Sequence, residues 1–256
     1  MQERQIDIQT RDGSMNTYIF HPDGDGPFPT VVLMMDSVGL REELSDMCRR
    51  IATVGYYVLM PNLFYRGARF VEFEADRIND PAYGNRRELW WSLIQQVNHD
   101  GIISDFRAML DHLRSDAASR SDRIGIVGYC LSGRFAFKLA AAFPDVVAAS
   151  ASLYGVKFIT DDPDSPHLDA GKIKGEMYFG VAEHDSWVPP KMIEQLGEVL
   201  KAAKINATVE LYPEVHHGFA FPDRRVYDKA AAERHWERLF CMWDRNLRGR
   251  GISHTA

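Results

Sequence analysis

Two patterns of apolar residues divide the chain. Near its start, apolar and polar residues alternate in segments 5–9 and 15–20, which the turn-forming residues 11–14 separate. Alternation is typical of strands with one face in water, so these segments predict a β-hairpin. Further along, continuous apolar runs replace the alternation, and such runs are typical of strands buried on both faces of a parallel sheet. The runs occupy residues 31–35, 56–60, 124–127, 148–153, 177–181 and 208–212.

Segments with helical spacing lie between these runs. They cover residues 42–53, 89–113, 131–143, 190–203 and 227–247. The alternation of strand and helix predicts an α/β fold, a mostly parallel central sheet with helices on both faces and the hairpin at one end. Gly101 interrupts the second segment, so two helices are expected there, the later one over residues 102–113.

The remaining stretches are irregular. Segments 64–86 and 159–175 are rich in Asp, Pro, Gly and Arg, and both are expected to cross the sheet edge near a functional site. From about residue 249 the chain has no pattern and reads as a flexible tail. Since neither a repeat nor a linker is evident, residues 1–256 are expected to form a single domain.

Composition narrows the possible partners. The 256 residues are 45% hydrophobic and 26% charged, as in ordinary globular proteins. The net charge is −6 and no Lys/Arg run occurs, which argues against nucleic acid. There is no signal-like apolar segment and no stretch of about 20 apolar residues, so we expect a cytoplasmic protein without membrane contact. Nothing indicates an oligomeric state.

The spacing of the three cysteines does not indicate a disulfide framework. Cys48, Cys130 and Cys241 are widely separated, and no CxxC pair or H-E-x-x-H spacing is present. Neither a disulfide network nor a metal site is therefore predicted, and no cofactor is expected. Cys48 and Cys241 lie in apolar helical segments and are expected to be core residues.

Cys130 has different surroundings. It lies in the segment Gly-Tyr-Cys-Leu-Ser-Gly, residues 128–133, between an apolar strand and an Ala-rich helix. This context predicts a nucleophile elbow, a tight turn in which small neighbours such as Gly128 and Ser132 let strand and helix approach. The helix N-terminus would stabilise a thiolate there. Ser132 is an alternative nucleophile, but Arg134 stands where its own elbow would need glycine.

An elbow nucleophile needs an acid and a histidine later in the chain. Asp185 follows the apolar run 177–181, and Glu183 is its nearest competitor. His216 and His217 both follow the last run, and chemistry alone does not separate them. A histidine would take the thiol proton, while the carboxylate would orient the imidazole.

These residues resemble the dienelactone hydrolase (carboxymethylenebutenolidase) family of the α/β-hydrolase fold. The likeness extends over nearly the whole chain, and its marks are segments 128–133, 180–185, 217–222 and 230–236. The resemblance implies a triad of Cys130, Asp185 and His217, and it favours His217 over His216. It also implies an oxyanion hole formed by the backbone amides of Ser37 and Leu131.

The resemblance assigns further roles. It places an acidic residue that modulates the thiol at Asp36, where dienelactone hydrolase itself has glutamate. In that enzyme arginines and a hydroxyl beside the histidine bind the substrate carboxylate, whereas Gly218 occupies the neighbouring position here. The substrate-binding candidates are Arg66, Tyr65, Arg86 (or Arg87) and Trp90.

Together these features predict an ester hydrolase acting on a small molecule, a lactone or enol ester of the dienelactone type, through an acyl-enzyme on Cys130. Two alternatives remain at this stage. One is a broad-specificity esterase for small esters or thioesters. The other is a non-catalytic relative that binds a ligand or senses redox state.

Overall fold

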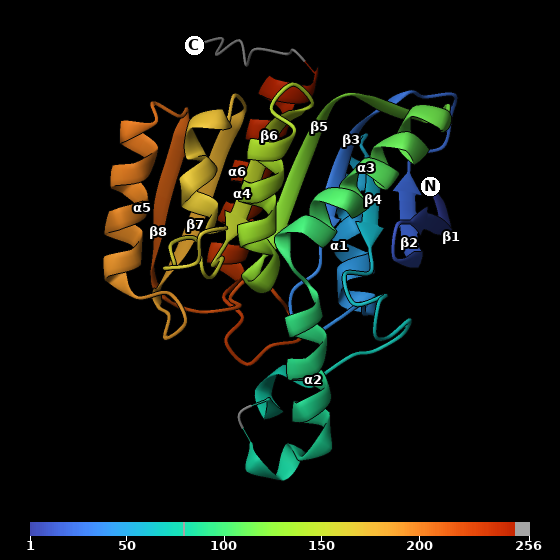
Figure 1. Cartoon of the computed structure of the whole chain (residues 1–256). Helices are drawn as coiled ribbons and strands as arrows, with labels where there is room; N and C mark the ends of the chain where they lie inside the picture. The colour runs from blue at the N-terminus through green and yellow to red at the C-terminus, as the bar shows by residue number, and fades with distance from the viewer. Residues whose placement is uncertain (79, 249–256) are drawn as a thin grey trace.

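The computed structural model describes residues 1–78 and 80–248. Its centre is an eight-stranded sheet in the order β1-β2-β4-β3-β5-β6-β7-β8, whose strands lie side by side across the molecule (Figure 1). β1 pairs antiparallel with β2, and β2 pairs antiparallel with β4. All other neighbouring strands are parallel. The strands are β1 (Gln2–Thr10), β2 (Gly13–His21), β3 (Phe28–Met34), β4 (Tyr57–Pro61), β5 (Ser119–Tyr129), β6 (Val147–Leu153), β7 (Glu176–His184) and β8 (Ala207–His216).

The predicted hairpin is confirmed by β1 and β2. Their register pairs Thr10 with Gly13 across a two-residue turn. Gly13 has φ +143°, a conformation that residues with a side chain rarely adopt. β2 then pairs with β4, so the hairpin forms the edge of the larger sheet.

The predicted parallel sheet is also confirmed, because each continuous apolar run coincides with a strand to within one residue. All residues of β4 are buried, as are the last six of β5, from Ile124 to Tyr129. Helices must therefore cover both faces of the central strands. The edge strand β8 is mostly exposed, which fits the polar residues Thr208 and Glu210 in its run.

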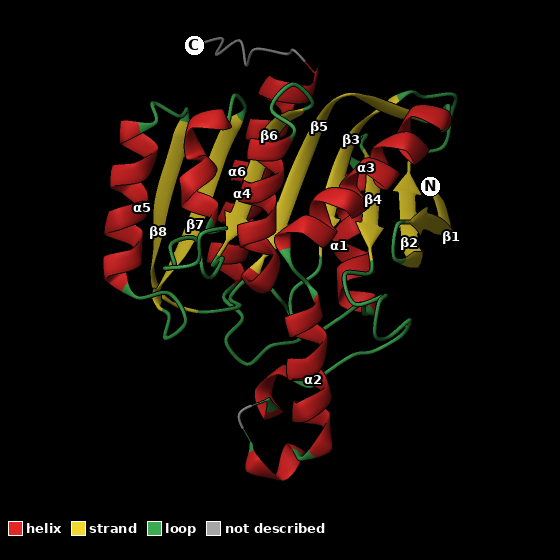
Figure 2. Cartoon of the chain, in the orientation of Figure 1, coloured by secondary structure: helices red, strands yellow, loops and turns green. Residues whose placement is uncertain are grey.

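Helices flank the sheet on both sides (Figure 2). α3 and α4 pack against each other and lie with α5 in front of the sheet, whereas α6 lies behind it. Arg50 of α1 pairs with Glu233 of α6 at 2.5 Å, so α1 shares the rear face. The helices are α1 (Glu42–Thr53), α2 (Asn85–Gln96), α3 (His99–Ser115), α4 (Gly133–Ala142), α5 (Pro190–Ala202) and α6 (Lys229–Trp243), which continues into a π-helical turn at Asp244–Arg248.

The break in the long helical segment is displaced from the predicted position. α2 ends before Val97, and Gly101 lies inside the first turn of α3. The Asn98 side chain caps α3 by accepting a hydrogen bond from the Gly101 amide at 2.9 Å. This cap ends the preceding segment and starts the next one. A Cβ at Gly101 would approach Arg66 at 3.1 Å, which explains a glycine there.

The two irregular segments behave differently. Residues 62–78 and 80–98 lie between β4 and α3, and α2 with short 3₁₀ turns at Ala75–Arg77 and Pro81–Tyr83 projects beyond the carboxyl ends of the parallel strands (Figure 1). We call this segment the cap. Residues 159–175 instead pack on α4, where Lys138 pairs with Asp164 and Asp169. Of these two segments, only the cap contributes residues to the pocket described below.

The predicted tail, from about residue 249, lies outside the described residues. Within the part of the chain that the structure describes, no helix is both long enough and apolar enough to cross a membrane.

Candidate active site

Cys130 occupies a strained turn between β5 and α4. Its φ is +52°, in the left-handed region that residues with a side chain seldom adopt. The turn is crowded, because a Cβ at Gly128 would collide with the carbonyl oxygen of Ser132, and one at Gly133 would collide with Ser152. Such strain concentrates at functional sites. The geometry is that of the nucleophile elbow expected from the sequence.

Ser132 serves the turn itself. Its hydroxyl is fully buried and donates toward the carbonyl oxygens of Met34 at 2.9 Å and Tyr129 at 3.1 Å. It also accepts a hydrogen bond from the Tyr129 amide at 2.9 Å. These bonds join the elbow to β3. A hydroxyl held in this way does not face the pocket, so the geometry disfavours Ser132 as the nucleophile.

The other two cysteines lie elsewhere. Cys48 in α1 is buried and contacts the Met60 sulfur at 3.7 Å, as expected of a core residue. Cys241 in α6 is only partly buried, a difference from the expected core position. Of the three cysteines, Cys130 alone lines the pocket beside His217.

Asp185 and His217 meet at the carboxyl ends of β7 and β8. The His217 Nδ1 and an Asp185 carboxylate oxygen lie 2.7 Å apart, and only 1% of the Asp185 side chain is exposed. The second carboxylate oxygen accepts a hydrogen bond from the Trp187 amide at 2.8 Å. Gly218 has φ +93°, which turns the chain immediately after the histidine.

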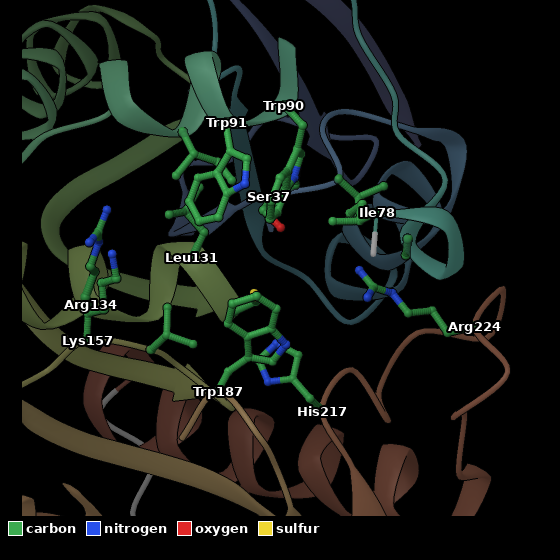
Figure 3. A pocket seen from close by; sticks show the side chains of 15 residues that line it. Ser37, Ile78, Trp90, Trp91, Leu131, Arg134, Lys157, Trp187, His217 and Arg224 are labelled. Atoms are coloured by element: carbon green, nitrogen blue, oxygen red, sulfur yellow. The ribbon is translucent and has the colours of Figure 1, made fainter. Parts of the chain in front are cut away.

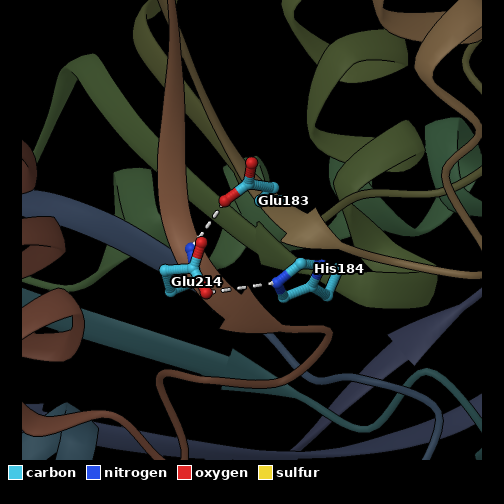
Figure 4. A group of neighbouring side chains, drawn as sticks. All are labelled: Glu183, His184 and Glu214. Carbon is cyan, nitrogen blue, oxygen red and sulfur yellow. Dashed lines mark hydrogen bonds and ion pairs between the residues drawn. The ribbon is translucent and has the colours of Figure 1, made fainter.

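Their sequence neighbours point away. His216 is exposed, and Glu183 accepts a hydrogen bond from the Glu214 amide at 2.7 Å. Figure 4 shows Glu183, His184 and Glu214 together, with His184 and Glu214 3.7 Å apart. The carboxylate and imidazole atoms of this trio lie close enough together to hold an ion, but all three side chains are exposed and nothing further indicates a metal.

His217 has an unusual electrostatic environment. Burial alone would lower its pKa, but the nearby Cys130 and the bond to Asp185 more than offset this and raise the pKa to about 10. Its Nε2 atom is buried and has no hydrogen-bond partner in the described chain. The ring of Tyr154 packs against the imidazole, with centroids 5.0 Å apart. A protonated imidazole next to Cys130 would favour the thiolate form.

A pocket opens above Cys130 at the carboxyl ends of the parallel strands (Figure 3). This end of an α/β sheet is where ligands usually bind. The cap supplies one wall and the strand-end loops supply the other. The lining residues are Ser37, Val38, Ala75, Ile78, Trp90, Trp91, Ile94, Cys130, Leu131, Arg134, Val156, Lys157, Trp187, His217 and Arg224.

The two residues expected to supply oxyanion amides, Ser37 and Leu131, both line this pocket beside Cys130. The Trp90 indole donates a hydrogen bond to the Ser37 carbonyl oxygen at 2.8 Å. Trp90 lines the pocket and also fixes the backbone at Ser37.

Asp36 has partners other than the thiol. Its fully buried carboxylate is paired with Arg41 at 2.8 Å and with Arg224, and it accepts the Val38 amide at 3.1 Å. Burial would raise the Asp36 pKa, but the two guanidinium groups offset this and lower it. The carboxylate is absent from the pocket lining, so the structure gives it the role of holding Arg224.

Three predicted substrate contacts lie outside the pocket lining. Arg66 is paired with Asp12 at 2.7 Å and with Asp105 at 2.8 Å. The Tyr65 hydroxyl also bonds to Asp105, at 2.8 Å. Arg86 donates to the Glu72 carbonyl oxygen and lies over the ring of Phe73. The Arg66 and Tyr65 contacts tie the cap to the hairpin and to α3, those of Arg86 lie within the cap, and the structure gives no support for substrate contact at these positions.

Several pocket residues were not predicted as such. Arg134 follows Cys130 by one helical turn, a spacing that could have placed it beside the elbow. Trp187 and Arg224 lie in the loops that carry Asp185 and His217. For Lys157, no local pattern in the sequence indicated a site.

The fold and the pocket define a class. An eight-stranded sheet of this order, with a strained elbow residue and an aspartate–histidine pair at the strand ends, is that of an α/β-hydrolase. Residues 15–246 match the model of the dienelactone hydrolase family. The chain belongs to this family and is a hydrolase of the dienelactone hydrolase type.

Named relatives agree with this assignment. The chain is 30% identical over 241 residues to a "Putative carboxymethylenebutenolidase" of Yersinia pestis, covering 91% of this chain and 84% of the relative. A protein of the same name from Methylorubrum extorquens is 27% identical over 239 residues, covering 92% and 78% of the two chains. A crystal structure titled as a putative dienelactone hydrolase from Klebsiella pneumoniae shares the fold, with a TM-score of 0.82, 23% identity and coverage of 94% and 98%.

Proposed function

We propose that the protein hydrolyses a lactone or enol ester of the dienelactone type through a Cys130-His217-Asp185 triad. The observation that carries the proposal is the pocket itself, which contains both the elbow cysteine and the unpartnered Nε2 of a histidine oriented by a buried aspartate. This is the arrangement that nucleophilic catalysis by a thiol needs. The names of the relatives supply the substrate class.

In the first half-reaction, the Cys130 thiol gives its proton to His217 Nε2, and the sulfur attacks the ester carbonyl. The carbonyl oxygen becomes an oxyanion, which the amides of Ser37 and Leu131 would stabilise. The carbon–oxygen bond of the leaving group then breaks, and His217 returns the proton to the departing oxygen. For a lactone the leaving oxygen stays attached to the acyl chain.

In the second half-reaction, His217 takes a proton from water, and the resulting hydroxide attacks the thioester. The carbon–sulfur bond breaks, the Cys130 sulfur regains a proton, and the acid is released. Asp185 stays ionised throughout and stabilises the imidazolium. The small-molecule substrate is the only partner that this scheme requires.

Steady-state hydrolysis of dienelactone and of 4-nitrophenyl acetate tests the proposal. Cys130→Ala should lower kcat/KM by about 1000-fold or more, since the acyl-enzyme is lost. Cys241→Ser, which changes a cysteine outside the pocket, is the matched control and should retain the wild-type rate. Full activity of Cys130→Ala would overturn the mechanism.

The same assay examines the alternatives. A preference for dienelactone over the aryl ester supports the proposed substrate class, whereas comparable rates would indicate a broad-specificity esterase. If neither ester nor a thioester is hydrolysed, the non-catalytic alternative is favoured. His216→Ala and His217→Ala form a second matched pair, of which only the His217 variant should lose activity.

A further inference from the structure

The pocket lining has an unbalanced charge. Besides His217, which is paired with Asp185, it contains the cationic side chains Arg134, Lys157 and Arg224, and it contains no carboxylate. Arg224 is neutralised by its ion pair with the buried Asp36. Within the described chain, Arg134 and Lys157 have no salt bridge. Two positive charges therefore face the pocket without a counter-charge from the protein.

Arg134 is the more constrained of the two. Its Nε atom is buried without a hydrogen-bond partner, and its guanidinium lies over the ring of Phe135, 4.6 Å from the centroid. Burial lowers the Arg134 pKa, and nearby Cys130 only partly opposes this. Arg134 is only partly buried, and its Nε–H is a single buried donor for which a bound anion can supply the acceptor.

The position of this pair is fixed relative to the elbow. Arg134 stands in the first turn of α4, four residues after Cys130. Lys157 lies in the loop after β6, where its φ is +59° and the preceding Val156 amide donates to the Cys130 carbonyl oxygen at 3.3 Å. In the view of Figure 3, Arg134 and Lys157 are at the left of the pocket and Arg224 is at the right.

Much of the remaining pocket lining is apolar. It includes Leu131 and Val156 from the strand-end loops and Trp91 and Ile94 from the cap. An oxyanion bound by the two cations would therefore be joined to the reacting carbonyl by an apolar part of the substrate. Guanidinium groups suit this task, because their planar donors match two oxygens of a carboxylate or phosphate.

We propose that Arg134 and Lys157 form an anion-binding subsite that selects ester substrates carrying a carboxylate or phosphate on the far side of an apolar segment. The inference rests on the proposed function and assigns a determinant of its specificity. The acidic group of the substrate would bind to Arg134 in α4 and Lys157 in the loop after β6. It would not bind to Arg66 and Arg86, which interact with other residues of the protein.

Paired esters test this subsite. Mono-4-nitrophenyl glutarate carries the charge on the acyl side and is compared with neutral 4-nitrophenyl pentanoate. For the alcohol side, 3-acetoxybenzoate is compared with phenyl acetate. A phosphonate analogue of the glutarate ester distinguishes the two oxyanions. The wild type should favour the charged member of at least one pair by about 10-fold or more in kcat/KM.

The variants isolate the two cations. Arg134→Gln and Lys157→Gln should each lower kcat/KM for the favoured charged ester by about 10- to 100-fold, with less than about a threefold change for its neutral partner. Arg134→Lys should recover part of the loss. Arg114→Gln, which removes an exposed arginine of α3 outside the pocket lining, is the matched control and should change neither rate.

A binding measurement separates this proposal from the proposed function. Calorimetric titration with glutarate should show binding to the wild type that weakens about 10-fold or more in Arg134→Gln, whether or not any ester is turned over. Equal rates on charged and neutral esters, or glutarate binding that does not depend on Arg134, would overturn the subsite. Loss of turnover on all esters with intact glutarate binding would instead count against the catalytic mechanism.

Discussion

His217 is held through one ring nitrogen by Asp185, at 2.7 Å, while its other ring nitrogen is buried without a partner in the described chain. Because Nδ1 is bonded to the carboxylate, Nε2 is the atom left to exchange a proton with Cys130. Asp185 is fixed in turn by the Trp187 amide and by its burial. The orientation of the imidazole for proton transfer therefore depends on Asp185.

Replacing that carboxylate should affect turnover strongly. Asp185→Asn should lower kcat by about 100- to 10,000-fold, because the amide neither stabilises the imidazolium nor maintains its tautomer. Glu183→Gln is the matched control, since Glu183 precedes Asp185 by two residues but bonds to the Glu214 amide. Steady-state kinetics on 4-nitrophenyl acetate would measure both. A comparable loss in the two variants would contradict the assignment of the acid.

Stability should depend on the protonation of His217. Its pKa is raised from 6.5 to about 10 in the folded protein. The stabilisation that this shift provides is complete below about pH 6.5 and is lost as the pH rises through about 10. Urea unfolding should show that the free energy of unfolding falls between about pH 6 and pH 10.5, and that this fall is smaller in His217→Gln than in the wild type. The same pH dependence in both proteins would exclude this contribution.

Asp36 should be important for stability. Asp36→Asn removes the charge that neutralises Arg41 and Arg224, and breaking a buried ion pair in this way typically costs about 3–5 kcal/mol. The matched control is Asp46→Asn, whose carboxylate pairs with Arg49 but is 70% exposed and should have little effect. Chemical denaturation at pH 7 measures the difference. Near-wild-type stability of Asp36→Asn would show that the ion pairs with Arg41 and Arg224 do not stabilise the folded protein.

The lowered pKa of Asp36 has a second consequence. A carboxyl group whose pKa lies below 3.8 in the folded state contributes stability above that pH and loses it as the pH falls further. The free energy of unfolding should therefore fall less steeply below about pH 4 in Asp36→Asn than in the wild type.

Ser132 should behave as a structural residue. Ser132→Ala removes a buried hydroxyl that bonds to Met34 and Tyr129, so the free energy of unfolding should fall by about 1–3 kcal/mol. The folded variant should keep kcat within about threefold of the wild type. Parallel measurements of activity and thermal unfolding test this. A folded variant without activity would restore Ser132 as the candidate nucleophile.

Much of the fold could be predicted from the sequence because it depends on local patterns. Each apolar run coincides with a strand to within one residue, and the helix predicted over 42–53 has those bounds in the structure. The helix break was placed at Gly101 because glycine is a common interruption. Asn98 sets it instead, since a capping side chain determines where a helix begins.

The site was predictable only in part. Chain order and the likeness to a family brought Cys130, Asp185 and His217 together, and the geometry is consistent with that choice. The residues of the pocket walls could not be predicted from the sequence, because they come from the cap and from loops whose contacts are long-range. Arg66 could be taken for a substrate ligand in the sequence, and only the structure places it between Asp12 and Asp105.

The central claim is that Cys130 carries the acyl group. Rapid acid quenching during turnover of 4-nitrophenyl acetate, followed by peptide mass spectrometry, tests it directly. The account predicts acetylation of the peptide that contains Cys130, confined to that residue and absent from the Cys130→Ala variant. Acetylation at Ser132, or undiminished turnover in Cys130→Ala, would contradict it.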